Sequence, residues 1–179
     1  MSLMVNYFDL FELPQALELD KAALTQKYYA LNKLYHPDKF TLSSEAEQTE
    51  ALEMSSKVNE GYKLLRKKQS RIHHLLELHN AAPQEGQTSM PQDFLMEMMD
   101  VNEAIMDYKM DPSEEGKNQV EVLLSRFEEE LEAQLSELQQ DLDFAAPAPE
   151  KLEILKDYFL KSKYLRRLKD NLADRTTEI

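Results

Sequence analysis

Apolar residues recur every three to four positions along most of the chain, with polar residues between them. This spacing predicts amphipathic α-helices, because the side chains of a strand would alternate with a period of two. In the N-terminal half it predicts helices over residues 7–13, 20–36, 44–65 and 70–79. In the C-terminal half it predicts three longer helices, over residues 91–110, 112–143 and 149–172.

The helix ends carry residues that cap or break helices. Asp20 can accept a hydrogen bond from the first N–H groups of its helix, and Ser44-Glu45-Ala46-Glu47 has the pattern of a capping box. Pro14 and Pro37 close the first and second helices. Gly61 weakens the third helix by about 1 kcal/mol relative to alanine, which indicates that another element packs closely there.

Residues 80–90, NAAPQEGQTSM, have no apolar period and contain proline, glycine and small polar residues, so they are expected to be a linker. The chain is therefore predicted to be all-α with two modules, residues 4–79 and 91–175. Short connections between the long C-terminal helices predict antiparallel neighbours, hence a three-helix bundle. Met1–Leu3 precede a second methionine, Met4, and either methionine can be the native start.

Composition excludes several classes of function. The net charge of −13 argues against nucleic acid as the main ligand. The absence of cysteine excludes disulfides and thiolate chemistry and favours a reducing, cytoplasmic location. No apolar run approaches the roughly 20 residues that cross a bilayer. Asp9 and Glu12 interrupt the apolar stretch near the N-terminus, so no secretory signal is expected.

The tripeptide His36-Pro37-Asp38 stands between two predicted antiparallel helices. A plain helix-stop turn, in which Asp38 accepts hydrogen bonds from nearby backbone N–H groups, is one interpretation. Catalysis by His36 as a base and Asp38 as its orienting partner is another. It would need a nucleophile or a metal and a pocket, and nothing nearby in the sequence supplies them. We therefore expect that the chain is not an enzyme.

The tripeptide follows KYYALNKLY, precedes a lysine and a phenylalanine, and faces VNEGYKLL (58–65) on the returning helix. Over residues 4–79 this pattern resembles the J domain of DnaJ-type co-chaperones, whose HPD loop stimulates ATP hydrolysis by a DnaK-type chaperone. The resemblance implies a chaperone-binding surface that consists of His36, Pro37, Asp38, Lys27, Lys33 and Lys39. The alternative for these lysines is that they are ordinary solvated charges on the helix surface.

The first helix of the second module has two apolar faces. The residues that form its core-facing stripe are Phe94, Met98, Val101, Ile105 and Tyr108. Leu95, Met99 and Met106 lie about 120° from the centre of that stripe, and Met96 lies further round beside acidic residues. Either neighbouring helices bury Leu95 and Met106, or a methionine-rich strip edged by carboxylates binds a protein with an apolar centre and a basic rim.

The segment FLMEMMDVNEAI, opening a bundle after a J domain, is similar to the HscB family of iron–sulfur assembly co-chaperones, as are SSEAEQ (43–48) and LLELH (75–79). The resemblance covers essentially the whole chain. It implies that the bundle binds the scaffold protein IscU and delivers it to the chaperone HscA. The scaffold-binding positions that it implies are Leu95, Met96, Met99, Asp100, Glu103 and Phe159. Relatives often have leucine and glutamate where this chain has Met99 and Asp100.

No cofactor or metal site is expected. Some relatives carry a zinc-binding CxxC extension, and this chain has no cysteine. His73 and His74 are adjacent on a predicted helix and cannot both face one metal ion, and no acidic or thiol ligand completes a site with His79. The protein is therefore expected to serve iron–sulfur assembly without holding iron itself.

The last two helices differ in charge. Residues 113–143 contain ten acidic and two basic side chains, and residues 151–175 contain eight basic and four acidic ones. Packed antiparallel, these helices would attract each other and set their register modestly. Ordinary solvated faces with some ion pairs between the helices are the preferred interpretation. The apolar stripe of the acidic helix could instead form a coiled-coil dimer, although a monomer is expected. The stripe consists of Leu124, Phe127, Leu131, Leu135, Leu138 and Leu142.

Three functions remain besides that of a hydrolase that uses His36 and Asp38. The leading one is a co-chaperone for transfer of an iron–sulfur scaffold. The others are a general J protein for unfolded clients and a helical or coiled-coil adaptor in which the HPD tripeptide is incidental.

Overall fold

The computed structural model describes residues 4–84 and 90–173. Met1–Leu3, most of the predicted linker (85–89) and the last two residues of the predicted second module (174–175) lie outside the described residues. The described part of the chain is all-helical, as predicted, with seven α-helices, one 3₁₀ helix and no strand. The chain divides into two compact units, Met1–Ala82 and Pro83–Ile179. No helix in the described part is long and apolar enough to cross a membrane.

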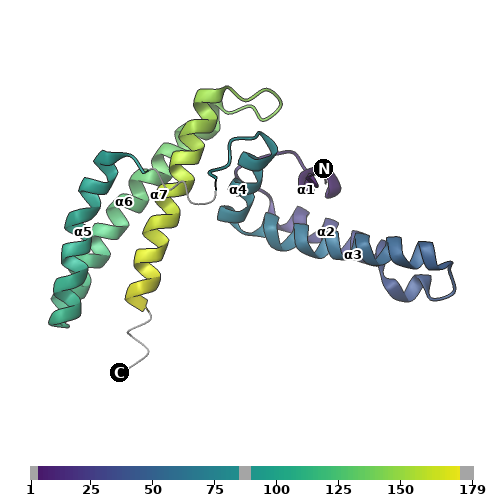
Figure 1. Ribbon diagram of the computed structural model, residues 1–179, viewed down its shortest axis with the longest axis horizontal. Helices are drawn as coiled ribbons and strands as arrows, with labels where there is room; N and C mark the ends of the chain where they lie inside the picture. Colours follow the sequence, from purple (N-terminus) through teal and green to yellow (C-terminus); the bar gives the residue numbers. More distant parts are fainter. Residues whose placement is uncertain (1–3, 85–89, 174–179) are drawn as a thin grey trace. The chain divides into compact units, whose positions relative to one another are not determined.

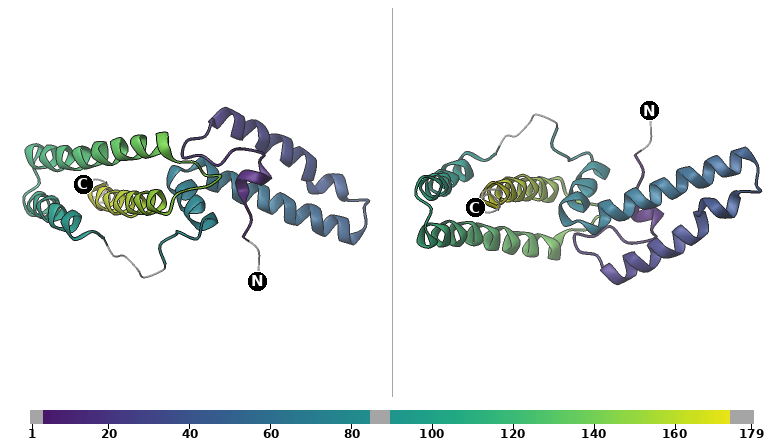
Figure 2. Two further views of the ribbon diagram at one scale, coloured as in Figure 1. Left: turned by 90° about the horizontal axis from the view of Figure 1, so that it is seen from above. Right: turned by 90° about the horizontal axis from the view of Figure 1, so that it is seen from below.

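The N-terminal unit consists of a long helical hairpin with shorter helices at its open end. Figures 1 and 2 show α2 and α3 side by side, with the 3₁₀ helix η1 at the turn between them. The elements of this unit are α1 (Tyr7–Leu10), α2 (Lys21–Tyr35), η1 (Pro37–Phe40), α3 (Glu45–Arg66) and α4 (Lys68–Leu78).

Capping residues begin the two hairpin helices as predicted. The Asp20 carboxylate accepts a hydrogen bond from the N–H of Ala22 at 2.8 Å. Ser44 and Glu47 form a complete capping box, in which each side chain accepts a hydrogen bond from the backbone N–H of the other. These bonds satisfy N–H groups that have no partner inside the helix, so they place the start of α2 and of α3.

Helix α1 is shorter than the sequence predicted, because a cap ends it before Pro14 does. The N–H of Leu13 donates to the carbonyl of Phe8 at 2.9 Å, and the N–H of Glu12 donates to the carbonyl of Asp9 at 3.0 Å. Glu12 adopts a left-handed backbone conformation, with φ of 50°. This pair of bonds is a Schellman motif, which reverses the chain immediately after the helix.

Helix α1 packs directly on the backbone of α3. A Cβ atom added at Gly61 would lie 2.6 Å from Cδ1 of Tyr7 and 2.9 Å from Cε2 of Phe11. The prediction that another element packs closely at Gly61 is therefore confirmed. The core below this contact is apolar and includes Phe8, Phe11, Leu17, Leu24, Val58, Leu65, Ile72, Leu75 and Leu76.

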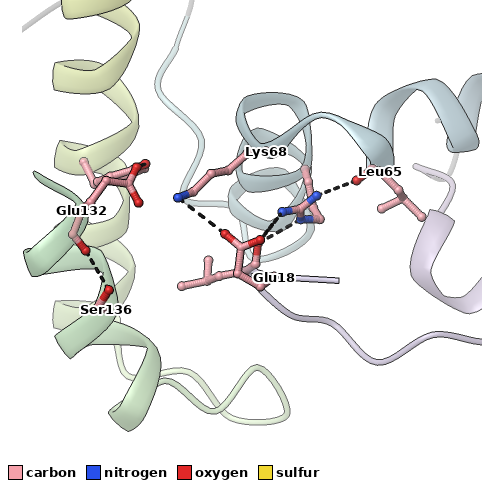
Figure 3. A network of polar contacts seen from close by, with 8 residues as sticks. Glu18, Leu65, Lys68, Glu132 and Ser136 are labelled. Carbon is pink, nitrogen blue, oxygen red and sulfur yellow. Dashed lines mark hydrogen bonds and ion pairs between the residues drawn. The ribbon is translucent and has the colours of Figure 1, made fainter. Parts of the chain in front are cut away.

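A buried arginine ties the loop after α1 to the junction between α3 and α4. The guanidinium of Arg71 donates to the carbonyl of Leu17 at 2.9 and 2.7 Å, and to the carbonyl of Leu65 at 2.7 Å. The carboxylate of Glu18 lies 3.3 Å from Arg71 and 3.5 Å from Lys68 (Figure 3). The charge of Arg71 is thus buried together with the acceptors that it needs.

The C-terminal unit is a three-helix bundle in which α6 packs against both α5 and α7. Its helices are α5 (Gln92–Met110), α6 (Glu114–Asp141) and α7 (Pro149–Ala173). The apolar stripe of α6 faces this bundle, and its members from Leu124 to Leu138 are at most 6% exposed. In the coiled-coil alternative, this stripe would contact the same helix of a second chain. Because the stripe is buried within its own bundle, it is not available for that contact in the folded unit.

The opposite charges of α6 and α7 meet across the bundle. Lys151 pairs with Asp141 at 3.2 Å, and Lys169 pairs with Glu128. These are partly exposed ion pairs, which contribute about 0–1 kcal/mol each, so they help to set the register while the core supplies most of the stability.

Candidate partner-binding sites

The HPD loop is built by the way in which α2 ends. His36 leaves the helix with φ of −65° and ψ of 124°, the extended conformation that a following proline favours. Pro37 then occupies the first turn of η1, where its missing N–H does not remove a hydrogen bond. The Nδ1 atom of His36 accepts a hydrogen bond from the N–H of Asp38 at 3.3 Å. The imidazole therefore caps η1, a role that the plain-turn interpretation gave to Asp38.

The two polar side chains of the loop face solvent. His36 and Asp38 are both exposed, and the side chain of Asp38 is 86% exposed. The Nδ1 atom of His36 lies 3.5 Å from Oδ2 of Asp38. The capping bond uses one edge of the imidazole and leaves the carboxylate open to a partner. The loop is thus ordered by its own hydrogen bonds before any partner binds.

A shallow hollow of about 370 Å³ adjoins the loop. Its walls come from the loop and from the first turns of α3, so a side chain that approached Asp38 would also contact α3. The lining residues are Pro37, Asp38, Thr41, Glu45, Gln48, Thr49 and Leu52.

The predicted lysines do not all lie together. Lys33, in the last turn of α2, and Lys39, in η1, are exposed close to the HPD tripeptide in the chain. Lys27 precedes Lys33 by six residues, which places it about 120° away around the helix. Its Nζ atom pairs with Glu12, and this pairing lowers the pKa of the Glu12 carboxyl. Lys27 is therefore engaged within the unit.

Two exposed apolar side chains on α2 were not identified from the sequence. Tyr29 and Leu34 are both more than half exposed, and Tyr29 lies one turn before Lys33. The signal was present, because Tyr28 follows the core residue Leu24 by four positions and so lies on the same side of the helix, and the next residue points about 100° away from it. Tyr28 indeed stacks on Tyr62 of α3, with ring centroids 4.1 Å apart.

The outer face of α5 is apolar and exposed. The core stripe lies on the other side of the helix, where Phe94 and Met98 are buried as predicted. Leu95 is 44% exposed and Met106 63% exposed, so the interpretation that neighbouring helices bury them is wrong. Met96 and Met99 are exposed as well. We call the exposed row of Leu95, Met96, Met99, Met106 and Met110 the methionine strip.

Carboxylates and a small hollow border the methionine strip. Asp100 and Glu103 are both exposed on α5. At the start of the helix, a hollow of about 220 Å³ lies beside Leu95. Its lining residues are Met90, Leu95, Leu160, Lys163, Tyr164 and Arg167.

Phe159 does not lie on this surface. It is only 7% exposed, and the ammonium of Lys163 lies 5.9 Å from its ring centroid. Helix α7 contacts both neighbours, because Tyr158 donates to Glu132 of α6 and Leu160 shares a hollow with Leu95 of α5. A wide face of α7 is therefore buried. The Phe159 ring is thus mostly buried, and its implied role in scaffold binding stays a prediction.

Two histidines, His74 in α4 and His79 just after it, make hydrogen bonds within the N-terminal unit. The Nε2 atom of His74 is buried and accepts a hydrogen bond from the N–H of Tyr7 at 3.2 Å, and the ring stacks on Phe8. A ring nitrogen of His79 lies 2.9 Å from Oε1 of Gln15. Within the described ranges, no group of three histidine, aspartate or glutamate side chains is arranged to hold a metal ion.

The fold defines a two-module J protein. One unit presents an HPD loop on a helical hairpin, and the other presents an apolar strip on a helical bundle. Residues 90–173 match the family model described as the HscB C-terminal oligomerisation domain. The chain belongs to the HscB family of co-chaperones.

Similar proteins from several bacteria support this membership. The chain is 33% identical over 176 residues to a co-chaperone protein HscB homolog of Shewanella denitrificans, covering 95% of this chain and 100% of that protein. It is 30% identical over 168 residues to the corresponding protein of Azoarcus, covering 93% of each. A match to the Pseudoalteromonas atlantica homolog is 41% identical and spans 58% of this chain and 59% of that protein.

Solved structures share the fold. Human co-chaperone protein HscB is similar with a TM-score of 0.78 and 25% identity, over 100% of this chain and 86% of that one. The chaperone HscB from Vibrio cholerae is similar with a TM-score of 0.71 and 25% identity, over 97% of this chain and 99% of that one.

Proposed function

We propose that this protein is a J-type co-chaperone of iron–sulfur cluster assembly. Its HPD loop would stimulate ATP hydrolysis by a DnaK/HscA-type chaperone, and its bundle would bring an IscU-type scaffold protein to that chaperone. The observation that carries the proposal is the loop itself, which is exposed, capped by His36 and stiffened by Pro37. Such a protein catalyses nothing itself, because it acts by stabilising a hydrolysis-competent conformation of its partner.

The geometry of the loop suits docking. Pro37 restricts the backbone and His36 holds the N–H of Asp38, so little conformational entropy is lost on binding. The exposed Asp38 carboxylate can accept a charge-assisted hydrogen bond from an arginine of the chaperone. Lys33 and Lys39 would steer the loop towards an acidic surface.

The bundle supplies a second, different surface. The exposed Leu95, Met96 and Met99 can cover an apolar patch of the scaffold, and methionine adapts well to such patches. Asp100 and Glu103 would pair with basic residues at its edge. Because the two surfaces belong to different units of the chain, one molecule can bind chaperone and scaffold.

We further propose that the cytoplasmic protein works as a monomer, although the matching family model is described as an oligomerisation domain. The stripe of α6 that could have joined two chains is buried inside the bundle. Sedimentation velocity over a wide range of concentrations tests this point, and a dimer that forms at low micromolar concentration would contradict it.

ATP turnover by a DnaK/HscA-type chaperone tests the main proposal. The wild-type protein should accelerate turnover, and His36→Gln should abolish most of the acceleration because the capping bond and the loop surface both change. His73→Gln is the matched control, since it changes a histidine of α4 outside the loop. Equal stimulation by the wild type and His36→Gln, or none by either, would refute the proposal.

A further inference from the structure

The methionine strip continues well beyond the residues of α5 that the family resemblance implied for scaffold binding. Met106 is 63% exposed and Met110 82% exposed. At 100° per residue, Leu95, Met99, Met106 and Met110 fall within about 60° of one another around α5. At 1.5 Å per residue they extend along about 22 Å of the helix. The strip therefore follows one side of α5, with Asn102 and Glu103 between Met99 and Met106, and the predicted site occupies its first half.

This exposure is selective. Met98 lies on the same helix and is fully buried in the bundle core, so α5 places one methionine inside and four outside. Exposed apolar side chains scattered singly are ordinary, but a row along one helix face marks an interaction surface. The predicted positions alone would also be few for a protein interface, because a standard interface uses about 20–30 residues on each side.

The charges beside the second half of the strip indicate what binds there. Glu103 and Asp107 are exposed next to Met106 and Met110 in the helical projection, and Lys109 lies on the other flank. An apolar ridge bordered by lysine or arginine would complement this surface. A second copy of the chain fits less well, because a two-fold contact repeats the same bordering charges on both sides, and Glu103 and Asp107 outnumber Lys109 there.

We infer that Met106 and Met110 form the second half of the scaffold-binding surface, where they contact an apolar segment of the scaffold that is bordered by lysine or arginine. The identity of the partner rests on the proposed function. The extent of the surface and the chemistry of the partner rest on the exposure and charge of α5.

Titration of the full-length chain with an IscU-type scaffold tests this inference. Met106→Ala combined with Met110→Ala should raise the Kd by about fivefold or more, which corresponds to a loss of about 1 kcal/mol shared between two contacting side chains. Val122→Ala on α6 removes a similarly exposed apolar side chain outside the strip and should leave the Kd unchanged. Thermal denaturation of each variant shows that the fold is intact.

Methionine oxidation provides a second readout that needs no substitution. Dilute hydrogen peroxide transfers one oxygen to the thioether, giving the sulfoxide and water, and mass spectrometry follows each site. In the free chain Met106 and Met110 should oxidise readily, whereas the buried Met98 should not. Addition of the scaffold should slow oxidation of Met106 and Met110.

The outcomes are distinguishable. Scaffold binding with no protection of Met106 and Met110, and with an unchanged Kd in the double variant, would overturn this inference alone. Protection that rises with the concentration of the chain itself, without scaffold, would identify a second copy as the occupant and would also overturn it. No scaffold binding by the wild type would overturn the proposed client as well.

Discussion

The aromatic ring of Tyr7 lies against Gly61 so closely that a Cβ atom at Gly61 would be 2.6 Å from Cδ1 of Tyr7. Gly61→Ala would improve helix propensity by about 1 kcal/mol, but it would force α1 away from α3. Overpacking of this kind lowers stability by about 1–3 kcal/mol. We expect a net loss in the free energy of unfolding, measured by chemical denaturation.

Gly116→Ala is the control for that experiment. A Cβ atom there would come nearest to Oγ of Ser113, at 3.1 Å, which is the end of a small side chain and not a packed ring. A smaller change in stability is expected. If Gly61→Ala were as stable as the wild type or more so, the close packing of α1 on α3 would be refuted.

His74 makes the stability of the N-terminal unit sensitive to acid. Burial lowers the pKa of its imidazole, and the carboxylate of Glu77, 3.6 Å from Nδ1, opposes this effect in part. The unfolded chain therefore binds a proton near the ordinary pKa of about 6.5, while the folded chain resists it. Stability should be fully present above that pH and should fall as the pH drops below it.

Urea denaturation at several pH values between 5 and 8 measures this dependence. Burial also lowers the pKa of His79, so both histidines contribute with the same sign. His74→Gln should reduce the slope of stability against pH below about pH 6.5. A slope that is the same in the variant as in the wild type would show that other groups are responsible.

Arg71 should be among the most sensitive positions in the N-terminal unit. Arg71→Met removes the donors that the buried carbonyls of Leu17 and Leu65 use, and each acceptor left unsatisfied costs about 1–3 kcal/mol. Arg66→Met changes an exposed arginine of α3 and should alter stability by no more than about 0.5 kcal/mol. Thermal denaturation compares the two, and equal effects would contradict the buried hydrogen-bond network.

Phe159 and the exposed residues of α5 should respond differently to truncation. Phe159→Ala removes a buried ring and should destabilise the bundle by about 3–5 kcal/mol. Leu95→Ala and Met96→Ala should change stability by about 0.5 kcal/mol or less, yet weaken scaffold binding. Denaturation and scaffold titration of the same variants separate the two effects. Undiminished binding by the Leu95 and Met96 double variant would exclude this surface.

Two lysines of α2, Lys33 and Lys27, should contribute unequally to stimulation of the chaperone ATPase. Lys33→Ala should weaken stimulation of the chaperone ATPase more than Lys27→Ala does, because Lys27 is paired with Glu12 on another side of the helix. The difference should shrink as salt is raised, since steering between exposed charges is screened. Stimulation measured at two ionic strengths checks this order. A larger loss from Lys27→Ala would show that the ion pair opens on binding.

Local features of the chain were predictable because their causes are local. A capping box forms between residues three apart, and a proline excludes helix from the residue before it. Ser44, Glu47 and the HPD tripeptide therefore predicted the helical hairpin and the loop at its turn. The core stripe of α5 followed from the spacing of its apolar residues. The similarity to HscB relatives agrees with the family resemblance that these motifs indicated.

Other features depend on which helices become neighbours. Phe159 and Met106 both belong to apolar positions of their helices, yet the Phe159 ring is buried while Met106 stays exposed. The bonds from Arg71 to Leu17 and from Lys27 to Glu12 join residues far apart in the chain. Sequence alone determined which segments form helices, the caps that begin α2 and α3, and the HPD loop, since these arise from contacts within a few residues. Tertiary packing decided which apolar and charged side chains stay exposed, because burial requires a partner from elsewhere in the chain.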